Sequence, residues 1–456
     1  MKQYDDYQVV AQKWVDEIPE HWDFYRIKRI FAQRVEKNDP VITENILSLT
    51  AKQGVVPIAE KEGAGGNKPK GDMTQYNVAR PDDLLVNCMN IVSGSAGVSR
   101  YFGAISPVYY ALYPRLDCNV WYYHYLFRLM PFQRNLLGLG KGILMHESDS
   151  GKLNTVRMRI SMDYLGNVPL PVPPRAEQDQ IVRYLDWQVS KINRLIAAKR
   201  KEIERIQEHL DKSIEIMFDK IASSSNDSIP LGRHITSIES GTSVNSIMGT
   251  ADNDSIGVLS TSCVYGNNFD LSQNKRVAPS DYGRVSCPVK KNTLIISRMN
   301  APSLVGACGF SEKDDTRVYL PDRLWQVRFD NALMPEYAWR YLSTKRIKSW
   351  FATIATGTSS SMKNITKPQL KSIQIPFPSL EKQAETVRRI KTLCDKCNAA
   401  CHVFEESIMH LIDLRTRLIS DVVTGQVDVR GIEVPEFEYV GEANEAGEHD
   451  EESEVG

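Results

Sequence analysis

The sequence predicts an α+β protein in which two repeated globular domains alternate with two long helices paired as an antiparallel intramolecular coiled coil. Three observations predict this arrangement. The chain has 456 residues, which is too long for one ordinary hydrophobic core. One stretch of sequence recurs without a gap 205 residues later. Each copy is followed by a heptad pattern of apolar residues, which is typical of a long helix that packs against a partner helix.

The predicted domains follow one another as globular domain, helix, globular domain, helix and tail. The first globular domain covers 1–174, and the first helix covers 175–221. The second globular domain covers 222–378, and 379–430 form the second helix with a short terminal motif. Residues 431–456 are predicted to be an acidic, disordered tail.

Charge is distributed unevenly between this tail and the rest of the chain. The tail has ten acidic residues and no Lys or Arg, whereas the rest of the chain holds 56 basic and 47 acidic residues, a net charge of +9. A basic body is compatible with a polyanionic partner such as nucleic acid. The tail is interpreted as a solubilising segment, with mimicry of nucleic acid against the basic body as the alternative.

The repeat aligns "YLGNVPLPVPPRAEQDQIVRYL" (164–185) with "QLKSIQIPFPSLEKQAETVRRI" (369–390). Each copy predicts a short alternating strand, a proline-bounded turn and the start of a helix, because Pro suits strand ends and first helical turns. More weakly, "LLVNCMN" (84–90) and "LIISRMN" (294–300) share a strand that ends in Met-Asn. The scaffolds of the two domains therefore match while their surfaces differ, which indicates two related domains that read different things.

Both predicted helices carry a seam of residues spaced alternately three and four apart. An amphipathic helix of this length needs a partner for its apolar stripe, and the nearest candidate is its repeat mate. An antiparallel pair is favoured, because a parallel pair would require the second globular domain to span the whole helix length. The predicted seam consists of Val189, Ile192, Ile196, Ile203, Ile206 and Leu210 on the first helix, and of Cys394, Cys397, Cys401, Phe404, Ile408 and Leu411 on the second.

The stretch "CDKCNAAC" (394–401) has cysteine spacings that raise the question of a zinc site. A closed structural zinc site needs four ligands, and the rise of a helix separates the first and third sulfurs by about 10 Å. We therefore expect the cysteines to pack in the seam and predict no metal. Eight scattered cysteines and no export signal indicate free thiols and a cytoplasmic protein. No run of 18 apolar residues is present, so no membrane partner is expected.

Three motifs of catalytic chemistry are absent from the sequence. The sequence contains no G-x-x-x-x-G-K-[ST] phosphate loop, no Asn/Asp-Pro-Pro-aromatic signature of adenine methyltransferases and no G-x-S-x-G elbow. We therefore predict a binding protein with no catalytic residues. Aromatic "WYYHYLFR" (121–128) could be a base-stacking platform, but its helical spacing favours a core role.

Basic polar segments of the two globular domains supply the candidate DNA contacts. Glycines let a backbone approach phosphate closely, and Arg and Asn side chains can pair with guanine and adenine edges. Plainer alternatives are a flexible hairpin tip for the first segment, an ion pair for the second and an ordinary linker for the third. The candidates are Lys68 and Lys70 in "GAGGNKPKGD" (63–72), Arg298 and Asn300 in "ISRMNAPS", and Lys363 and Asn364 in "GTSSSMKN" (357–364).

With the repeat established, the chain resembles the specificity subunit of type I restriction-modification enzymes over almost its whole length. The resemblance lies in "IPEHWDFYRIKRIF" (18–31), "ISMDYLGNVPLPVPPRAEQDQIVRYLD" (160–186), "SMKNITKPQLKSIQIPFPSLEKQAETV" (361–387) and "LISDVVTGQVDVR" (418–430). It is the duplicated order of these stretches that is specific. The chain departs from the family's pattern in its seam cysteines and in its acidic extension.

The resemblance implies that this chain recognises DNA and that partner subunits carry out catalysis. Each globular part would be a target recognition domain that reads one half of a split, asymmetric site in double-stranded DNA, and the paired helices would set the spacer. The chain itself would bind no cofactor. It would dock two methyltransferase subunits that use S-adenosylmethionine, and restriction subunits with ATP and Mg²⁺ would complete the enzyme as translocating nucleases.

Two rival functions remain at this stage. A non-catalytic coiled-coil scaffold would recover no consensus from a random-sequence DNA library. A metal-dependent nuclease would cleave DNA as the isolated chain with magnesium, and chelation would abolish that cleavage.

Overall fold

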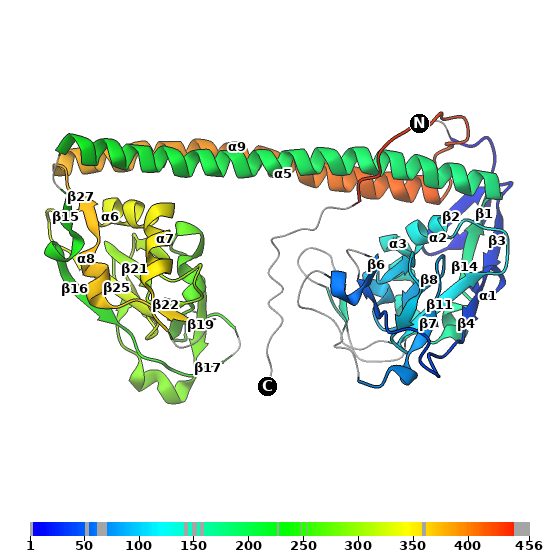
Figure 1. Ribbon diagram of the computed structural model, residues 1–456, viewed down its shortest axis with the longest axis horizontal. Helices are drawn as coiled ribbons and strands as arrows, with labels where there is room; N and C mark the ends of the chain where they lie inside the picture. Colours follow the sequence, from blue (N-terminus) through cyan, green and yellow to red (C-terminus); the bar gives the residue numbers. More distant parts are fainter. Residues whose placement is uncertain are drawn as a thin grey trace. The chain divides into compact units, whose positions relative to one another are not determined.

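The computed structural model describes residues 3–50, 54–61, 71–140, 145–147, 153–155, 159–225, 228–247, 249–252, 254–357 and 362–441. The chain divides into two compact units: unit 1 comprises 1–200 and 405–456, and unit 2 comprises 201–404. Two long helices, α5 (Arg175–Ser225) and α9 (Leu380–Val423), each contribute one part to unit 1 and the other to unit 2 (Figure 1). Helices and sheets are both prominent, so the predicted α+β class is confirmed.

Unit 1 is built around a four-stranded antiparallel sheet with the order β4-β11-β8-β9, and β14 pairs with β3 beside it. Strand β8 is buried along its whole length, which explains its uninterrupted apolar start. The elements of unit 1 before α5 are β1 (Tyr7–Gln12), β2 (Val15–Pro19), β3 (Asp23–Arg26), α1 (Ile27–Ile30), β4 (Phe31–Arg34), β5 (Leu47–Thr50), β6 (Gly54–Pro57), β7 (Asn77–Ala79), β8 (Leu84–Asn87), β9 (Ala96–Val98), β10 (Gly103–Ile105), β11 (Tyr109–Pro114), α2 (Val120–Phe127), α3 (Met130–Asn135), β12 (Met145–Glu147), β13 (Leu153–Thr155), α4 (Met162–Leu165) and β14 (Pro169–Val172).

The aromatic helix α2 forms much of the unit 1 core. Its residues Tyr122, Tyr123 and Phe127 have no exposed surface, and Tyr123 contacts the ring of Phe31 edge to face. The hydroxyl of Tyr122 donates to the carbonyl of Val423 at the end of α9, at 2.8 Å. The core role predicted for "WYYHYLFR" is therefore confirmed, and α2 also ties the sheet to the end of α9.

Unit 2 contains a four-stranded antiparallel sheet with the order β16-β25-β21-β23 and a mixed five-stranded sheet with the order β17-β19-β18-β24-β20. Strand β27 pairs with β15 beside them. The elements of unit 2 between α5 and α9 are β15 (Ser228–Pro230), β16 (Ile235–Ser240), β17 (Ser246–Ile247), β18 (Gly257–Leu259), β19 (Asn274–Val277), β20 (Pro288–Val289), β21 (Thr293–Ser297), β22 (Met299–Asn300), β23 (Cys308–Ser311), β24 (Asp315–Tyr319), β25 (Leu324–Phe329), α6 (Pro335–Leu342), α7 (Lys345–Ile354), β26 (Lys363–Asn364), α8 (Lys367–Ser372) and β27 (Gln374–Pro376).

The core of unit 2 joins its sheet to both long helices. Phe218 of α5 packs against the rings of Tyr337 and Tyr341 in α6, with centroids 5.3 and 5.0 Å apart. Val387 and Ile390 of α9 belong to the same buried cluster. Burial of large aromatic and aliphatic side chains supplies most of the favourable free energy of such a core.

The two four-stranded sheets are connected in the same way. In each sheet the strands, numbered by their order along the chain, lie in the spatial order first, fourth, second, third. A glutamine near the start of each long helix also makes the same two contacts. Gln178 accepts from the amide of Asn119 and donates to the carbonyl of Pro173, at 2.8 and 2.7 Å. Gln383 accepts from the amide of Met334 and donates to the carbonyl of Pro378, at 2.9 and 3.0 Å.

Helix α9 ends in a glycine turn that brings the terminal motif against the beginning of the chain. Gly425 adopts a φ of +76°, the left-handed conformation that favours glycine at helix ends, and a Cβ there would overlap Pro19. The amide of Gln426 donates to the carbonyl of Asp421 at 2.7 Å and completes the turn.

Within the described residues, no helix is long and apolar enough to cross a membrane.

Candidate nucleic-acid interface

Four of the six predicted DNA-contact residues come together in unit 2. Strand β22 pairs antiparallel with β26, so that Met299 faces Asn364 and Asn300 faces Lys363. The carbonyl of Arg298 also accepts from the amide of Ile365 at 2.9 Å. We call this two-stranded feature, residues 298–300 with 363–365, the polar edge of unit 2.

Arg298 and Asn300 differ in how freely they could reach a ligand. The Arg298 side chain is 26% exposed; its Nε donates to the carbonyl of Asp322 at 2.6 Å, and its Nη2 lies 3.9 Å from that residue's carboxylate. Asn300 is only 9% exposed, and its Nδ2 donates to the hydroxyl of Tyr265 at 3.0 Å and to Ser297 Oγ at 3.2 Å. Its Oδ1 accepts from the amide of Ala301. The Asn300 amide therefore serves the loop itself in this conformation, and its predicted base contact stays a prediction.

Lys363 and Asn364 are both half-buried. Lys363 takes part in no ion pair among the described residues. Asn364 exchanges two backbone hydrogen bonds with Thr356, at 3.0 and 2.8 Å, while its side-chain Oδ1 is buried and accepts no hydrogen bond from the described part of the chain. A buried amide oxygen without a donor carries a cost in free energy, so the DNA contact predicted for Asn364 stays a prediction.

The other two predicted contacts, Lys68 and Lys70, lie outside the described residues. Their assignment to DNA stays a prediction.

All twelve predicted seam residues are buried or half-buried. Cys401 is 8% exposed and Cys394 and Cys397 are half-buried, whereas Val403 is 64% exposed. Within the described part of the chain, all eight cysteines are free thiols, and no group of three or more His, Cys, Asp or Glu side chains has the geometry to hold a metal ion. Burial thus follows the heptad spacing through the cysteine stretch.

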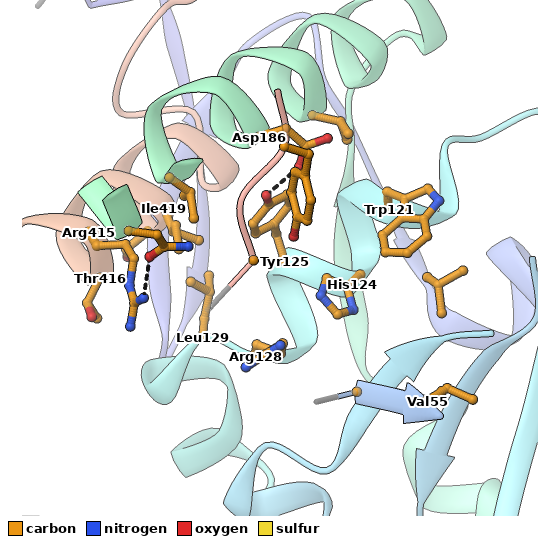
Figure 2. A pocket seen from close by; sticks show the side chains of 18 of the residues that line it. Val55, Trp121, His124, Tyr125, Arg128, Leu129, Asp186, Arg415, Thr416 and Ile419 are labelled. Atoms are coloured by element: carbon orange, nitrogen blue, oxygen red, sulfur yellow. Dashed lines mark hydrogen bonds between the residues drawn. The ribbon is translucent and has the colours of Figure 1, made fainter. Parts of the chain in front are cut away.

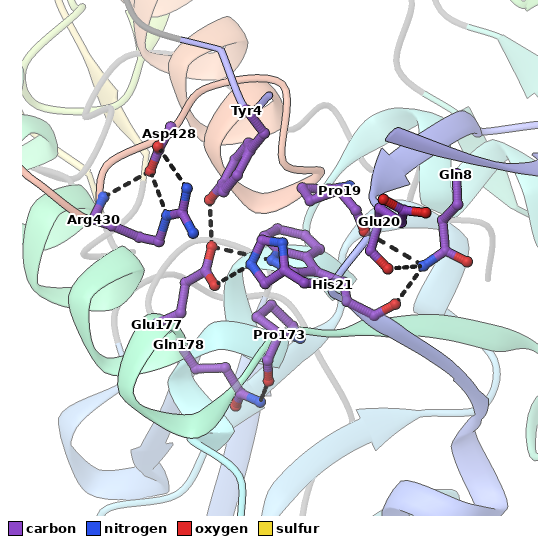
Figure 3. A network of polar contacts seen from close by, with 11 residues as sticks. Tyr4, Gln8, Pro19, Glu20, His21, Pro173, Glu177, Gln178, Asp428 and Arg430 are labelled. Atoms are coloured by element: carbon purple, nitrogen blue, oxygen red, sulfur yellow. Dashed lines mark hydrogen bonds and ion pairs between the residues drawn. The ribbon is translucent and has the colours of Figure 1, made fainter. Parts of the chain in front are cut away.

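A buried polar network in unit 1 joins the beginning of the chain, the start of α5 and the terminal motif (Figure 3). The carboxylate of Glu177 accepts from the hydroxyl of Tyr4, from Trp22 Nε1 at 3.1 Å and from His21 Nε2, 2.8 Å away. Burial, together with the hydrogen bond to Glu177, raises the pKa of Tyr4 well above its usual value. Beside the network, the bidentate contact with Asp428 raises the pKa of Arg430. The arrangement holds Tyr4, His21 and Trp22 on the first turn of α5, with Arg430 of the terminal motif over the Tyr4 ring.

Beyond this network the chain continues along α5. We call residues 431–441 the C-terminal strap, because side chains of α5 hold its backbone. This finding corrects the predicted tail, which began at residue 431: the strap is bound to α5, while 442–456 lie outside the described residues. The contacts are Gln180 to the carbonyl of Ile432 (2.6 Å), Arg183 to that of Val434 (2.8 Å), Arg194 to that of Glu438 (2.8 Å), Asn193 to that of Val440 (2.9 Å), and the Val440 amide to Ser190 Oγ (3.0 Å).

The strap borders a cavity of about 1260 Å³ between the unit 1 sheet, α2 and the long helices (Figure 2). Trp121, His124 and Tyr125 of α2 line it, and the Tyr125 hydroxyl donates to Asp186 at 2.6 Å. Burial lowers the pKa of His124 to about 3, with smaller effects of nearby arginines, so its imidazole is neutral near pH 7. Arginines and aspartates line the cavity in equal number, so its charge alone selects no ligand; they are Arg100, Arg128, Arg415, Arg417, Asp82, Asp186, Asp413 and Asp421.

Comparison with known proteins identifies the family to which unit 2 is related. The sequence profile described as Type I restriction modification DNA specificity domain matches residues 258–402, all within unit 2. Residues 258–402 are thus similar to a type I restriction-modification DNA specificity domain. The resemblance predicted from the sequence is therefore confirmed, and the polar edge lies inside the specificity domain.

A curated relative agrees with this assignment. The Type I restriction enzyme EcoEI specificity subunit of Escherichia coli is 22% identical over 193 residues, which are 41% of this chain and 32% of that subunit. The match spans about a third of the relative's length.

Two solved structures align with most of the chain. A chain from a study of complex assembly and conformational transition of the type I R-M system matches with a TM-score of 0.56 and 14% identity, over 90% of this chain and 99% of that one. The HsdS subunit from Thermoanaerobacter tengcongensis matches with a TM-score of 0.41 and 15% identity, over 90% of this chain and 98% of that one. The first likeness supports the fold, and the second score is too low to support an argument.

The structural roles of three polar residues near the starts of the long helices, Glu177, Gln178 and Gln383, were not predicted from the sequence. Gln178 and Gln383 occupy matching positions of the repeat, and that identity was the signal of their shared role. Glu177 gave no such signal, because its repeat position is Lys382 and its partners are far away in the sequence.

Proposed function

We propose that this chain is the DNA-recognition subunit of a type I restriction-modification complex. Unit 1 and unit 2 each read one half of a bipartite, asymmetric site. The observation that carries this proposal is the recurrence in unit 1 of the strand order of unit 2, the unit that contains the matched specificity domain. Two recognition domains on one chain account for two half-sites without a second copy of the chain.

The proposed repeat has support beyond strand order. The glutamine contacts of Gln178 and Gln383 agree atom by atom. Strands β14 and β27 pair with β3 and β15 at the same place, just before each long helix. We accordingly assign target recognition domains to 1–174 and 222–378, the first spacer helix to 175–221, and the second spacer helix with the terminal motif to 379–430.

We further propose that α5 and α9 pair antiparallel as a coiled coil that sets the spacer between the half-sites. In unit 1, Asn193 in the first half of α5 contacts Arg415 near the end of α9. In unit 2, Phe218 near the end of α5 shares a core with Val387 near the start of α9. Both contacts are compatible with an antiparallel pair of helices, and neither is compatible with a parallel pair.

The DNA-facing chemistry of unit 2 is proposed to lie at its polar edge. Arg298 and Lys363 supply positive charge for phosphates or guanine, and Asn364 follows Lys363 on β26. Catalysis is assigned to partners: two methyltransferase subunits with S-adenosylmethionine, and restriction subunits with ATP and Mg²⁺. In that role the chain acts in the cytoplasm on double-stranded DNA.

Methylome sequencing tests the proposal. The chain is expressed with its methyltransferase partner in a host that lacks other adenine methylation. We expect methyladenine within one bipartite, asymmetric motif with a constant spacer. A coiled-coil scaffold without sequence-specific binding would give no motif, and methylation at a single continuous motif would contradict the assignment of two reading domains.

A further inference from the structure

The polar edge of unit 2 has a structural counterpart in unit 1. In unit 2, the amide of Ile365 donates to the carbonyl of Arg298 at 2.9 Å. In unit 1, the amide of Ile160 donates to the carbonyl of Cys88 at 3.0 Å. Ile160 precedes Ile365 by the 205 residues that separate the two sequence copies. In unit 1, the residue that follows β8 therefore bonds to the segment that precedes α4. In unit 2, the residue that follows β21 bonds in the same way to the segment that precedes α8.

A second pair of contacts fixes the register. The amide of Asn87 donates to the carbonyl of Ser95 at 3.0 Å, and the amide of Ser297 donates to that of Ala307 at 2.8 Å. Both loops turn at a glycine in the left-handed region: Gly94 has a φ of +81° and Gly306 one of +80°. Because the left-handed glycine lies just before the second hydrogen-bonded residue in both loops, the loop after β8 and the loop after β21 return to their sheets in the same way.

These contacts equate three positions of unit 1 with members of the polar edge. Cys88 takes the place of Arg298, Asn90 that of Asn300, and Arg159 that of Asn364. The position equivalent to Lys363 is residue 158, which lies outside the described residues.

The chemistry at these positions suits a polyanion with hydrogen-bonding bases. Arg159 is exposed, and a hydrogen bond with the Tyr110 hydroxyl, with smaller effects from Cys88, raises the pKa of its guanidinium. Asn90 is exposed, and its side chain makes no hydrogen bond with the described residues, whereas its counterpart Asn300 is buried and bonded. A free carboxamide can pair with both the donor and the acceptor of an adenine edge, and a guanidinium can bind guanine or phosphate.

We propose that Asn90 and Arg159 form the DNA-contacting edge of unit 1 and help to specify the half-site that this unit reads. The inference rests on the proposed function and assigns residues to it. The backbones of the two edges correspond while the side chains differ, an arrangement that lets one scaffold read two different half-sites.

The test compares binding to three duplexes by the complex of this chain with its methyltransferase partner. One duplex carries the full site found by methylome sequencing, and the others carry a scrambled first or second half-site. The variants are Asn90→Ala, Arg159→Ala and Lys363→Ala. Arg26→Ala is the matched control, because Arg26 is an exposed arginine of unit 1 in the separate β3–β14 sheet.

We expect Asn90→Ala and Arg159→Ala each to reduce discrimination at one half-site by about tenfold, the effect of one lost base contact. Lys363→Ala should act at the other half-site, and Arg26→Ala at neither. Wild-type discrimination by the Asn90 and Arg159 variants would overturn the inference. Equal loss at both half-sites would also overturn it, since that indicates damage to the fold, which thermal unfolding of each variant reports separately. If the unmodified complex did not discriminate among the duplexes, the proposed function itself would fail.

Discussion

Arg415 of α9 donates a hydrogen bond from Nη1 to the Oδ1 of Asn193 in α5, at 2.7 Å. Asn193 is 3% exposed, and its Nδ2 donates to the carbonyl of Val440 in the strap, at 2.9 Å. One buried amide therefore joins the two long helices and the end of the described chain.

Replacing Asn193 should weaken the contacts that join α5, α9 and the strap and so lower the stability of the protein. Asn193→Ala leaves the Arg415 guanidinium and the Val440 carbonyl without this partner, which should cost about 1–3 kcal/mol in the free energy of unfolding. Urea denaturation measures the loss. Leu195→Ala is the control, because Leu195 is 52% exposed on the same helix. An equal cost for both variants would show that the amide does not act as a buried link.

The strap should contribute to stability through its backbone contacts with α5. We expect a chain truncated after Arg430 to unfold at a lower temperature than one truncated after Gly441, because only the longer chain keeps the acceptors of Arg183 and Arg194. Net hydrogen-bond contributions of about 1 kcal/mol each predict a difference of several degrees. Identical melting temperatures would mean that the strap lies on α5 without stabilising it.

The loop of the polar edge should tolerate no side chain at its glycine. A Cβ at Gly306 would overlap the ring of the fully buried Phe351, and the φ of +80° is strained for any other residue. Gly306→Ala should therefore destabilise the protein by about 3 kcal/mol or more. Gly266 has a similar φ of +67° and no atom within 4 Å of a Cβ, so Gly266→Ala should cost only about 1 kcal/mol. Equal losses would place the cost in the backbone rather than in the contact with Phe351.

His124 should make the stability of the protein depend on pH. Its folded-state pKa of about 3 lies below the ordinary value, chiefly through burial and then through Arg128 and Arg100. Asp186, bound to neighbouring Tyr125, also faces the cavity. Between pH 6.5 and pH 3 the unfolded chain binds a proton that the folded chain does not, so stability falls as pH falls through that window and is constant in this respect above it.

Comparing His124→Phe with wild type isolates this effect. One proton changes the free energy of unfolding by at most about 1.4 kcal/mol per pH unit, so the wild type should lose more stability between pH 7 and pH 5 than the variant does. Parallel stability curves in that range would show that the imidazole titrates normally in the folded protein.

Features that follow a periodic pattern of apolar residues could be predicted from the sequence. Contacts between segments far apart in the sequence could not. The seam residues and the strands before each long helix obey heptad or alternating patterns, and burial agrees with them even at Cys401. The role of Asn300 could not be predicted, because its partner Tyr265 reaches it through the fold of a separate loop. The strap was assigned to the disordered tail because residues 431–456 as a whole hold ten acids and no Lys or Arg, yet backbone carbonyls of the strap accept hydrogen bonds from α5.

The spacer of the recognised site tests the central claim most directly. A heptad inserted at facing points of α5 and α9 keeps the seam in register and lengthens each helix by about 10 Å, the length of about three base pairs. Methylome sequencing should then return both half-sites unchanged with a spacer about three base pairs longer. An unchanged spacer, or altered half-site sequences, would contradict the account that two domains read the DNA and the helix pair sets their separation.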